Sequence, residues 1–156
     1  MPYYHFVINA HAPHQVVTER LRSVHKTPRE LAALPEPSRR ELVTPFVGYV
    51  KEDSFSLKRN IRYRNSFLPL IRGRIVSTET GTQVKVTMFM HPVVAVFMAF
   101  WLWFVGSGAL AETSMLWLMF TFGLALTLGG FFPEVIKAKR MLTEAVLGPE
   151  AELLQT

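Results

Sequence analysis

Two long apolar stretches in the second half of the chain constrain its fold more than any other feature. Pro92–Ala111 and Ser114–Phe132 contain no charged side chain, and only Glu112 and Thr113 separate them. A helix rises about 1.5 Å per residue, so each stretch can cross a hydrocarbon core about 30 Å thick. Apolar side chains would surround both helices and leave no polar stripe for water. The alternative is a buried helical pair in a soluble protein, but a chain of 156 residues has too little other protein to cover it. We therefore expect a transmembrane hairpin over residues 92–132.

The distribution of charge predicts how this hairpin lies in a membrane. Residues 1–91 hold 14 of the 17 Lys and Arg residues but only 7 of the 12 Asp and Glu residues. More basic residues follow Phe132, whereas the connection between the two stretches holds only Glu112. Basic flanks stay in the cytoplasm, so we expect a multi-pass protein of the plasma membrane with both termini on that side. The first ten residues lack the basic start and apolar block of a signal peptide, which fits the same orientation.

The first 91 residues show the alternation and helical spacing of a small α+β domain. Tyr3–Ala10 alternates apolar and polar side chains, as a half-buried strand does. One helix should begin near Pro13, and another should begin at Thr27, where Thr27 and Glu30 can form a capping box. Residues 35–45 hold three prolines and are typical of a linker. Four further strands are predicted at Phe46–Val50, Phe55–Arg64, Leu68–Val76 and Thr82–Met90.

A last helix is predicted from Pro133, directly after the second apolar stretch, with Gly148 as its stop. Its apolar residues form one stripe: Val135, Ile136, Leu142, Ala145 and Val146. We expect this stripe to pack on the sheet; a helix lying in the membrane interface is the alternative. The predicted fold class is α+β, a small antiparallel sheet of about five strands with packed helices, plus a transmembrane hairpin inserted before the C-terminal helix. The corresponding divisions of the chain are residues 1–91, 92–132 and 133–156.

An ordered set of motifs precedes and includes the apolar stretches. It consists of Phe46-x-Gly48, Phe55, the run RNIRYRNSFLPLIRGRI from Arg59 to Ile75, the two stretches and Glu134. Over residues 46–140 this order resembles a group of small bacterial membrane proteins that have no assigned activity. The resemblance implies a bacterial inner-membrane location and a domain ahead of a membrane hairpin, and it leaves the activity open. The first strand and helix also resemble the start of some lipid-binding helix-grip domains.

Basic residues gather on the polar side of the predicted strands ahead of the hairpin. The candidate contacts for anionic lipid or a protein partner are Lys58, Arg62, Arg64, Arg72 and Arg74. If residues 65–69 formed a short hairpin loop, Arg62 would lie opposite Arg72, and Asn60 opposite Arg74. The alternatives are a solvated face of a one-sided sheet, an acidic partner protein or small anion, and nucleic acid. No recognised nucleic-acid motif accompanies the basic residues, so nucleic acid is not expected.

Arg59 differs from these residues because it shares the apolar face of Leu57 and Ile61. Such an arginine either extends past the sheet edge to water or pairs with a buried carboxylate, and we expect the first. Around it we assign structural roles, with Asn65 and Ser66 forming a turn and Pro69 marking the start of a strand. The structural set is Arg59, Tyr63, Asn65, Ser66, Pro69 and Gly73.

Signals for catalysis are missing from the pattern of residues. His11-x-x-His14 has no third ligand at metal-binding spacing, and the chain contains no cysteine. No glycine-rich phosphate loop lies outside the apolar stretches. We therefore expect no catalytic residues, no metal and no cofactor.

The sequence predicts a non-enzymatic, membrane-anchored domain that binds anionic lipid or a protein partner. One alternative is a membrane-tethered domain with a small-ligand pocket between the sheet and the first helix, lined by Phe6, Ile8, Val17 and Ile61. Another is an accessory subunit of a larger membrane complex. Membrane lipids are the expected partners, together with a membrane protein or further copies of this chain.

Overall fold

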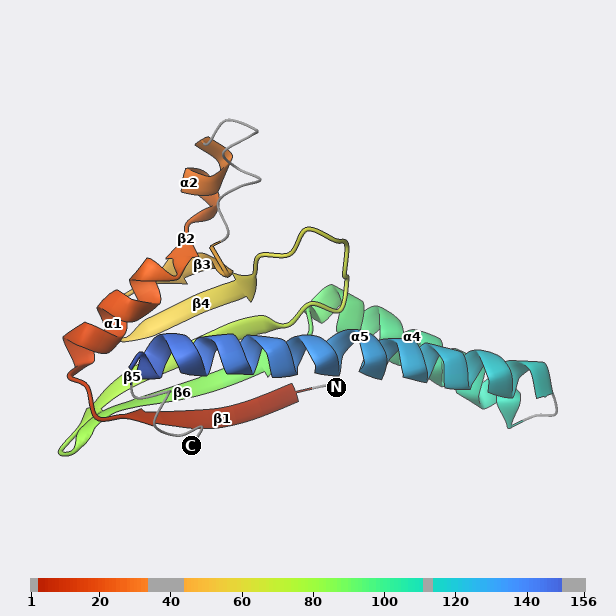
Figure 1. Cartoon of the computed structure of the whole chain (residues 1–156). Helices are drawn as coiled ribbons and strands as arrows, with labels where there is room; N and C mark the ends of the chain where they lie inside the picture. Colours follow the sequence, from red (N-terminus) through yellow and green to blue (C-terminus); the bar gives the residue numbers. More distant parts are fainter. Residues whose placement is uncertain (1–2, 34–43, 111–113, 150–156) are drawn as a thin grey trace.

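The computed structural model describes residues 3–33, 44–110 and 114–149, which form an α+β fold with one six-stranded mixed sheet (Figure 1). The strand order across the sheet is β1-β6-β5-β4-β3-β2. Its strands are β1 (Tyr3–Ala10), β2 (His25–Lys26), β3 (Phe46–Val50), β4 (Ser54–Arg59), β5 (Leu70–Thr78) and β6 (Gly81–Phe89). The helices are α1 (His14–Ser23), α2 (Pro28–Ala33), α4 (Pro92–Ala109) and α5 (Ser114–Leu147). Most of the predicted linker at residues 35–45 lies outside the described residues.

The prediction of a small, wholly antiparallel sheet of about five strands was wrong at one edge. β2 adds a sixth strand, which pairs in parallel with β3 through His25 and Phe46. A strand of two residues is too short to show alternation, so no pattern in the sequence predicts it. The capping box at the start of α2 is confirmed, because the Glu30 side chain accepts a hydrogen bond from Thr27 N at 2.8 Å and Glu30 N donates to Thr27 Oγ1 at 3.2 Å.

The predicted hairpin between the fourth and fifth strands was also wrong. β4 ends at Arg59 and β5 begins at Leu70, so residues 60–69 form a longer loop. Ser56 therefore lies opposite Arg72, and Ser54 lies opposite Arg74, in place of the predicted Arg62 and Asn60. Alternation alone could not end the strand, since Ile61 and Tyr63 continue the pattern of Phe55 and Leu57 while belonging to the loop.

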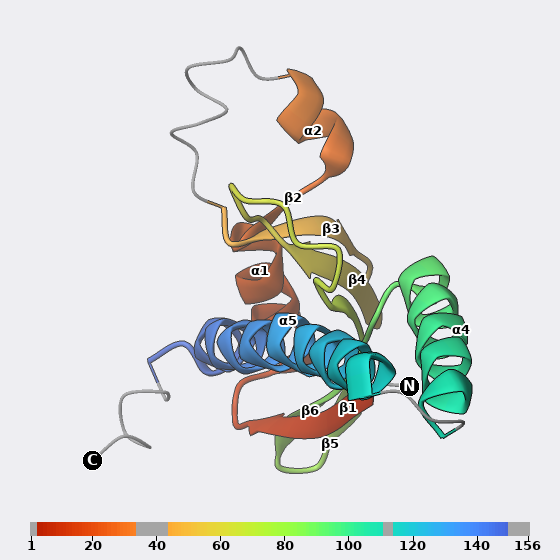
Figure 2. The same ribbon diagram turned by 90° about the vertical axis from the view of Figure 1, so that its right-hand side faces the viewer.

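The core lies on one face of the sheet, between the strands and helices α1 and α5 (Figure 2). Ile8 of β1, Val17 and Leu21 of α1, and Val135 and Leu142 of α5 belong to one buried cluster. Two of the residues predicted to line a ligand pocket, Ile8 and Val17, are thus packed against protein side chains. On the same face Phe55 lies opposite Gly73, and a Cβ at Gly73 would come within 2.2 Å of the Phe55 ring. Because glycine has no side chain, position 73 leaves room for the Phe55 ring in the core.

The helix predicted to begin at Pro133 is the second half of a single helix, α5, which runs through the second apolar stretch without a break. That half packs on the sheet as expected, with Val135, Leu142 and Val146 buried, but Ile136 of the predicted stripe is exposed. The predicted stop is confirmed, because Gly148 has φ 57° and Gly148 N donates to Glu144 O. Arg20 of α1 donates to the carbonyl oxygens of Val146 and Leu147, which ties α1 to the end of α5.

The first half of α5 and helix α4 lie beyond the end of the sheet and contact one another (Figure 1). Within the described residues, α5 from Met115 to Leu147 is the one helix long and apolar enough to cross a membrane by length and composition. The apolar part of α4, Pro92–Gly108, is shorter. Small residues face the contact between the helices: a Cβ at Gly106 would lie 3.3 Å from Phe120, and one at Gly123 would lie 3.3 Å from Trp101.

Candidate functional site

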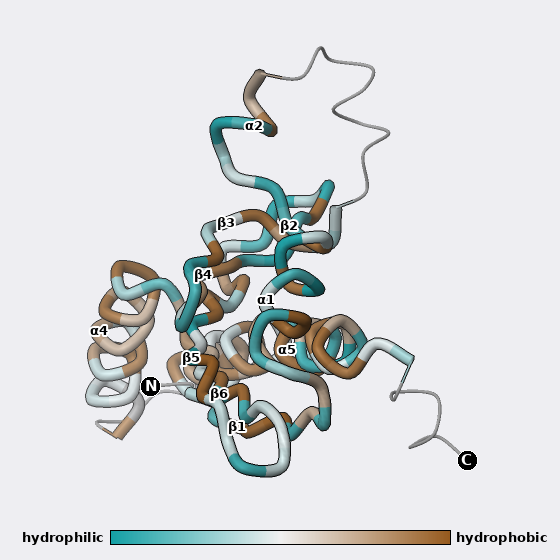
Figure 3. The backbone as a smooth tube through the Cα atoms, turned by 90° about the vertical axis from the view of Figure 1, so that its left-hand side faces the viewer, coloured by the Kyte–Doolittle hydropathy of each residue, from teal (hydrophilic) through white to brown (hydrophobic). Residues whose placement is uncertain are grey.

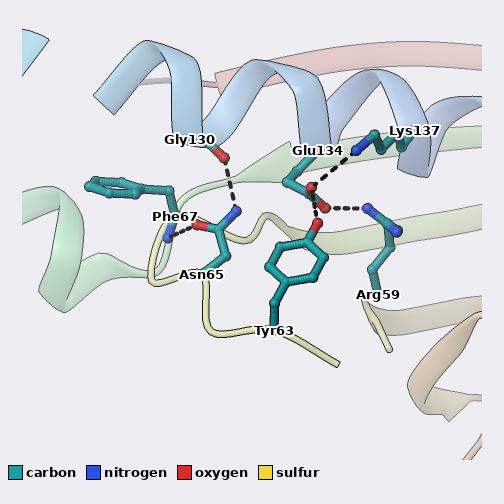
Figure 4. A network of polar contacts seen from close by, with 7 residues as sticks. All are labelled: Arg59, Tyr63, Asn65, Phe67, Gly130, Glu134 and Lys137. Atoms are coloured by element: carbon teal, nitrogen blue, oxygen red, sulfur yellow. Dashed lines mark hydrogen bonds and ion pairs between the residues drawn. The ribbon is translucent and has the colours of Figure 1, made fainter. Parts of the chain in front are cut away.

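The loop at residues 60–69 leaves the sheet and contacts α5 at the point where that helix passes onto the core (Figure 4). We call this contact the junction. It consists of Arg59, Tyr63, Asn65 and Phe67 on the β4–β5 side, and of Gly130 and Glu134 on α5. Towards the start of α5 most side chains are exposed, and from Phe131 onward one stripe is buried under the sheet. The junction therefore marks the boundary between two environments along one helix.

Glu134 is the centre of the junction and is only 4% exposed. Its carboxylate accepts hydrogen bonds from the Arg59 guanidinium and from the Tyr63 hydroxyl (Figure 4). Lys137 Nζ lies 3.9 Å from the same carboxylate, one turn along α5. Removing either partner of a buried ion pair leaves an uncompensated charge, which makes this pair structurally important. The expectation that Arg59 extends past the sheet edge was wrong, because a buried carboxylate lies within its reach.

The bond to Glu134 also changes the acidity of Tyr63. The hydrogen bond that its hydroxyl donates to the carboxylate raises the pKa of Tyr63 above its usual value. Partial burial and the negative charge of Glu134 act in the same direction, while Arg59 acts weakly against them. Tyr63 is consequently a neutral donor throughout the physiological pH range.

Asn65 connects the loop to the backbone of α5. Its side-chain oxygen accepts from Phe67 N at 2.9 Å, which closes the predicted turn, and its amide donates to the carbonyl oxygen of Gly130 at 3.1 Å. Pro133, one turn further along α5, has no N–H to donate to the carbonyl oxygen of Gly129, four residues back, and its ring crowds the preceding turn. Asn65 bonds to the next carbonyl oxygen, that of Gly130, and so holds the loop against α5 beside its internal proline.

Of the other loop residues in the predicted structural set, Pro69 is buried and Ser66 is exposed. Phe67 packs directly over Gly130, since a Cβ at position 130 would come within 2.6 Å of its ring. Pro69 is buried immediately before β5, where its missing N–H removes no ladder bond within that strand. The glycine at position 130 therefore allows the loop to approach the helix closely.

The five predicted contact residues divide into two groups in the structure. Arg62 and Arg64 are exposed in the loop near the junction. Lys58, Arg72 and Arg74 are exposed on the sheet face that points away from α5. Lys85 of β6, which is not among the predicted contact residues, lies directly opposite Arg74 on that face. We call Lys58, Arg72, Arg74 and Lys85 the outer basic face.

No ion pair joins the outer basic face to an acid among the residues that the structure describes. Asp53, from the turn before β4, lies instead 3.2 Å from His14 Nε2. Arg72 is placed over the Phe89 ring, 5.2 Å from its centre. Directly opposed cations are unfavourable across a strand pair, so the Arg74–Lys85 pair keeps uncompensated positive charge on this face.

The residues that the structure describes offer no metal site. No group of three or more His, Cys, Asp or Glu side chains there could hold a metal ion. His14 is engaged with Asp53, and His11 lies outside α1. The comparisons add no family: no known family, curated protein or solved structure matches the chain. The site is therefore defined by its own geometry. It consists of the buried ionic junction, the exposed loop arginines Arg62 and Arg64, and the outer basic face.

Proposed function

We propose that the protein is an integral membrane protein whose α4 and first half of α5 cross the bilayer. The single observation that carries this proposal is the exposure of α5: only 17% of its most apolar stretch is buried. A core helix of a soluble protein is mostly covered, whereas here Phe122, Leu118 and Trp117 point outward. α4 adds Val93, Phe97 and Trp103, all exposed, and its trace is largely in the apolar colours of Figure 3.

Membrane insertion would place the junction at the surface of the bilayer. In Figure 1 the long strands run in about the same direction as α5, so they lead away from the membrane and not along it. Arg62 and Arg64 then lie at the level of the lipid headgroups. A strand rises about 3.3 Å per residue, so Arg72 and Arg74 lie about 7 Å and 13 Å beyond the start of β5. Salt screens charges beyond about 8 Å, so the loop arginines are the stronger lipid contacts.

The function supported best is that of a cytoplasmic domain held rigidly at the inner membrane, with loop arginines that bind anionic headgroups. The junction makes the domain an extension of the membrane helix, because α5 continues from one region into the other. The outer basic face supports a second function, the binding of an acidic protein partner, since it looks sideways from the sheet and carries opposed cations. This arrangement also fits an accessory subunit of a membrane complex.

Membrane topology tests the proposal directly, and the absence of native cysteine makes the test simple. Single cysteines at Thr113 and Ser77 would be labelled in intact cells with a membrane-impermeant thiol reagent. We expect labelling of Thr113→Cys in intact cells, and of Ser77→Cys only after the membrane is opened. Alkaline carbonate should leave the chain in the membrane pellet. Release by carbonate, or labelling of both positions from the same side, would contradict the proposal.

A further inference from the structure

A groove lies next to the junction, between the loop at residues 60–69 and the first half of α5. It is a shallow groove of about 470 Å³ that is open along its length. Tyr63 and Arg64 line it from the loop, and Phe122, Leu126 and Gly129 line it from α5. The α5 residues are spaced four and three apart, so they share one face of the helix. The groove therefore joins an apolar helix surface to a polar loop.

Two neighbouring glycines of α5 behave differently at this place. A Cβ at Gly130 would strike the Phe67 ring, so that position is filled by the junction. A Cβ at Gly129 would meet no atom within 4 Å apart from the adjoining backbone of its own helix. The space at Gly129 is thus open, and it is part of the groove floor. Packing within the described residues does not explain why a glycine with open space around it stands here.

The groove is apolar at one end and positively charged at the other. Phe122 and Leu126 are exposed and apolar, and they lie toward the start of α5. Arg64 is the one charged side chain among its lining residues and is exposed at the loop end. A negatively charged headgroup on an apolar chain would satisfy both ends. The spanning segments of a second copy would not, because residues 92–110 and 114–132 contain no acid to meet Arg64.

We propose that this groove binds one anionic phospholipid, with an acyl chain along Phe122 and Leu126 and the phosphate beside Arg64. The inference rests on the membrane-spanning function proposed above, which places the apolar part of the groove among acyl chains. It adds a specific site to that function: the lipid fills the space at Gly129 and contacts the loop that is fixed to Glu134. The bond from Arg64 to the phosphate is charge-assisted. A zwitterionic lipid also carries a cation that Arg64 repels, so the site prefers an anionic lipid.

The test uses the full chain in nanodiscs that contain equal amounts of phosphatidylglycerol and phosphatidylcholine. After mild detergent extraction, native mass spectrometry measures how much of each lipid stays bound. The native chain should retain one phosphatidylglycerol. Gly129→Leu places an apolar side chain in the groove, starting from a Cβ position with open space around it, and should lower this retention by about tenfold or more. Arg64→Gln should remove the preference for phosphatidylglycerol while leaving some lipid bound.

Leu128→Phe is the matched control, since it adds bulk at an exposed position of α5 that does not line the groove. It should retain phosphatidylglycerol as the native chain does. Circular dichroism melting identifies any variant that has lost its fold. Equal retention by the native chain, Gly129→Leu and Leu128→Phe would overturn the lipid site. So would a dimer that Gly129→Leu dissociates, because a second copy would then occupy the groove. Carbonate release of the native chain would overturn the membrane function as well, whereas a chain that stays embedded with unchanged retention contradicts the lipid site alone.

Discussion

The two faces of the sheet treat positive charge in opposite ways. On the inner face, Arg59 lies against the core and is matched by one buried carboxylate, Glu134, from a helix far away in the sequence. On the outer face, Arg74 lies directly opposite Lys85, and no described acid pairs with either. Charge on the inner face therefore holds the molecule together. The opposed cations of the outer face lower the stability of the fold. Such uncompensated charge is typical of a surface that binds an oppositely charged partner.

The largest expected effect comes from breaking the inner pair, which consists of Arg59 and Glu134. Glu134→Ala would leave Arg59 buried without its carboxylate and should lower the free energy of unfolding by about 3–5 kcal/mol. The measurement is urea unfolding of the full chain in mild detergent, followed by circular dichroism. The matched control is Glu144→Ala, which breaks an exposed pair with Arg140 on the same helix and should cost less than about 1 kcal/mol. Equal losses in the two variants would show that burial does not distinguish these pairs.

The next effect compares the arginines of the loop with those of the outer face. Arg62→Gln with Arg64→Gln should lower the enrichment of anionic lipid around the chain by about 1 kcal/mol for each arginine at low salt. Arg72→Gln with Arg74→Gln should change it much less, because those residues lie about a Debye length farther along the strand. The measurement is the ratio of phosphatidylglycerol to phosphatidylcholine that co-purifies at low and high salt. An equal effect of both double variants would mean that the outer face looks toward the bilayer.

A smaller effect is expected from Tyr63, which contributes a neutral donor to the inner pair. Tyr63→Phe removes its hydrogen bond to Glu134 and should cost about 1 kcal/mol, since the ring is half exposed. The pKa of Tyr63 is raised in the folded chain, so the folded state favours the protonated hydroxyl. This contribution is complete below the unfolded pKa of about 10 and is lost as pH rises through the higher folded value.

The difference in unfolding free energy between the native chain and Tyr63→Phe should therefore stay constant from about pH 6 to 9 and shrink at higher pH. Taking the difference at each pH removes the titration of lysines common to both chains. A difference that shrinks well below pH 9 would contradict the raised pKa.

The sequence predicted the outer face better than the inner pair, for a physical reason. Outward positions follow from strand alternation, so the exposure of Lys58, Arg72 and Arg74 could be read from local pattern alone. The partner of Arg59 lies 75 residues away in sequence, on a helix whose rotation about its axis depends on packing. A signal did exist: Glu134 is the single acid between Glu112 and Glu144, and it directly follows an apolar stretch and Pro133. The end of β4 was missed because loop residues such as Tyr63 keep the alternation while contacting α5.

The smallest expected effect comes from removing the repulsion between Arg74 and Lys85 on the outer face. Arg74→Glu places a carboxylate directly opposite Lys85 and should raise the free energy of unfolding by a few tenths to about 1 kcal/mol. Arg74→Glu acts in two ways, by removing a repulsion and by adding an attraction to Lys85. Arg74→Gln removes the repulsion alone and should give about half the gain. High salt should reduce both gains, since the pair is exposed. Unfolding in urea at low and high salt measures these differences. A loss of stability in Arg74→Glu would show that Arg74 already has a stabilising role within the domain, and the outer face would then no longer be a surface kept for a partner.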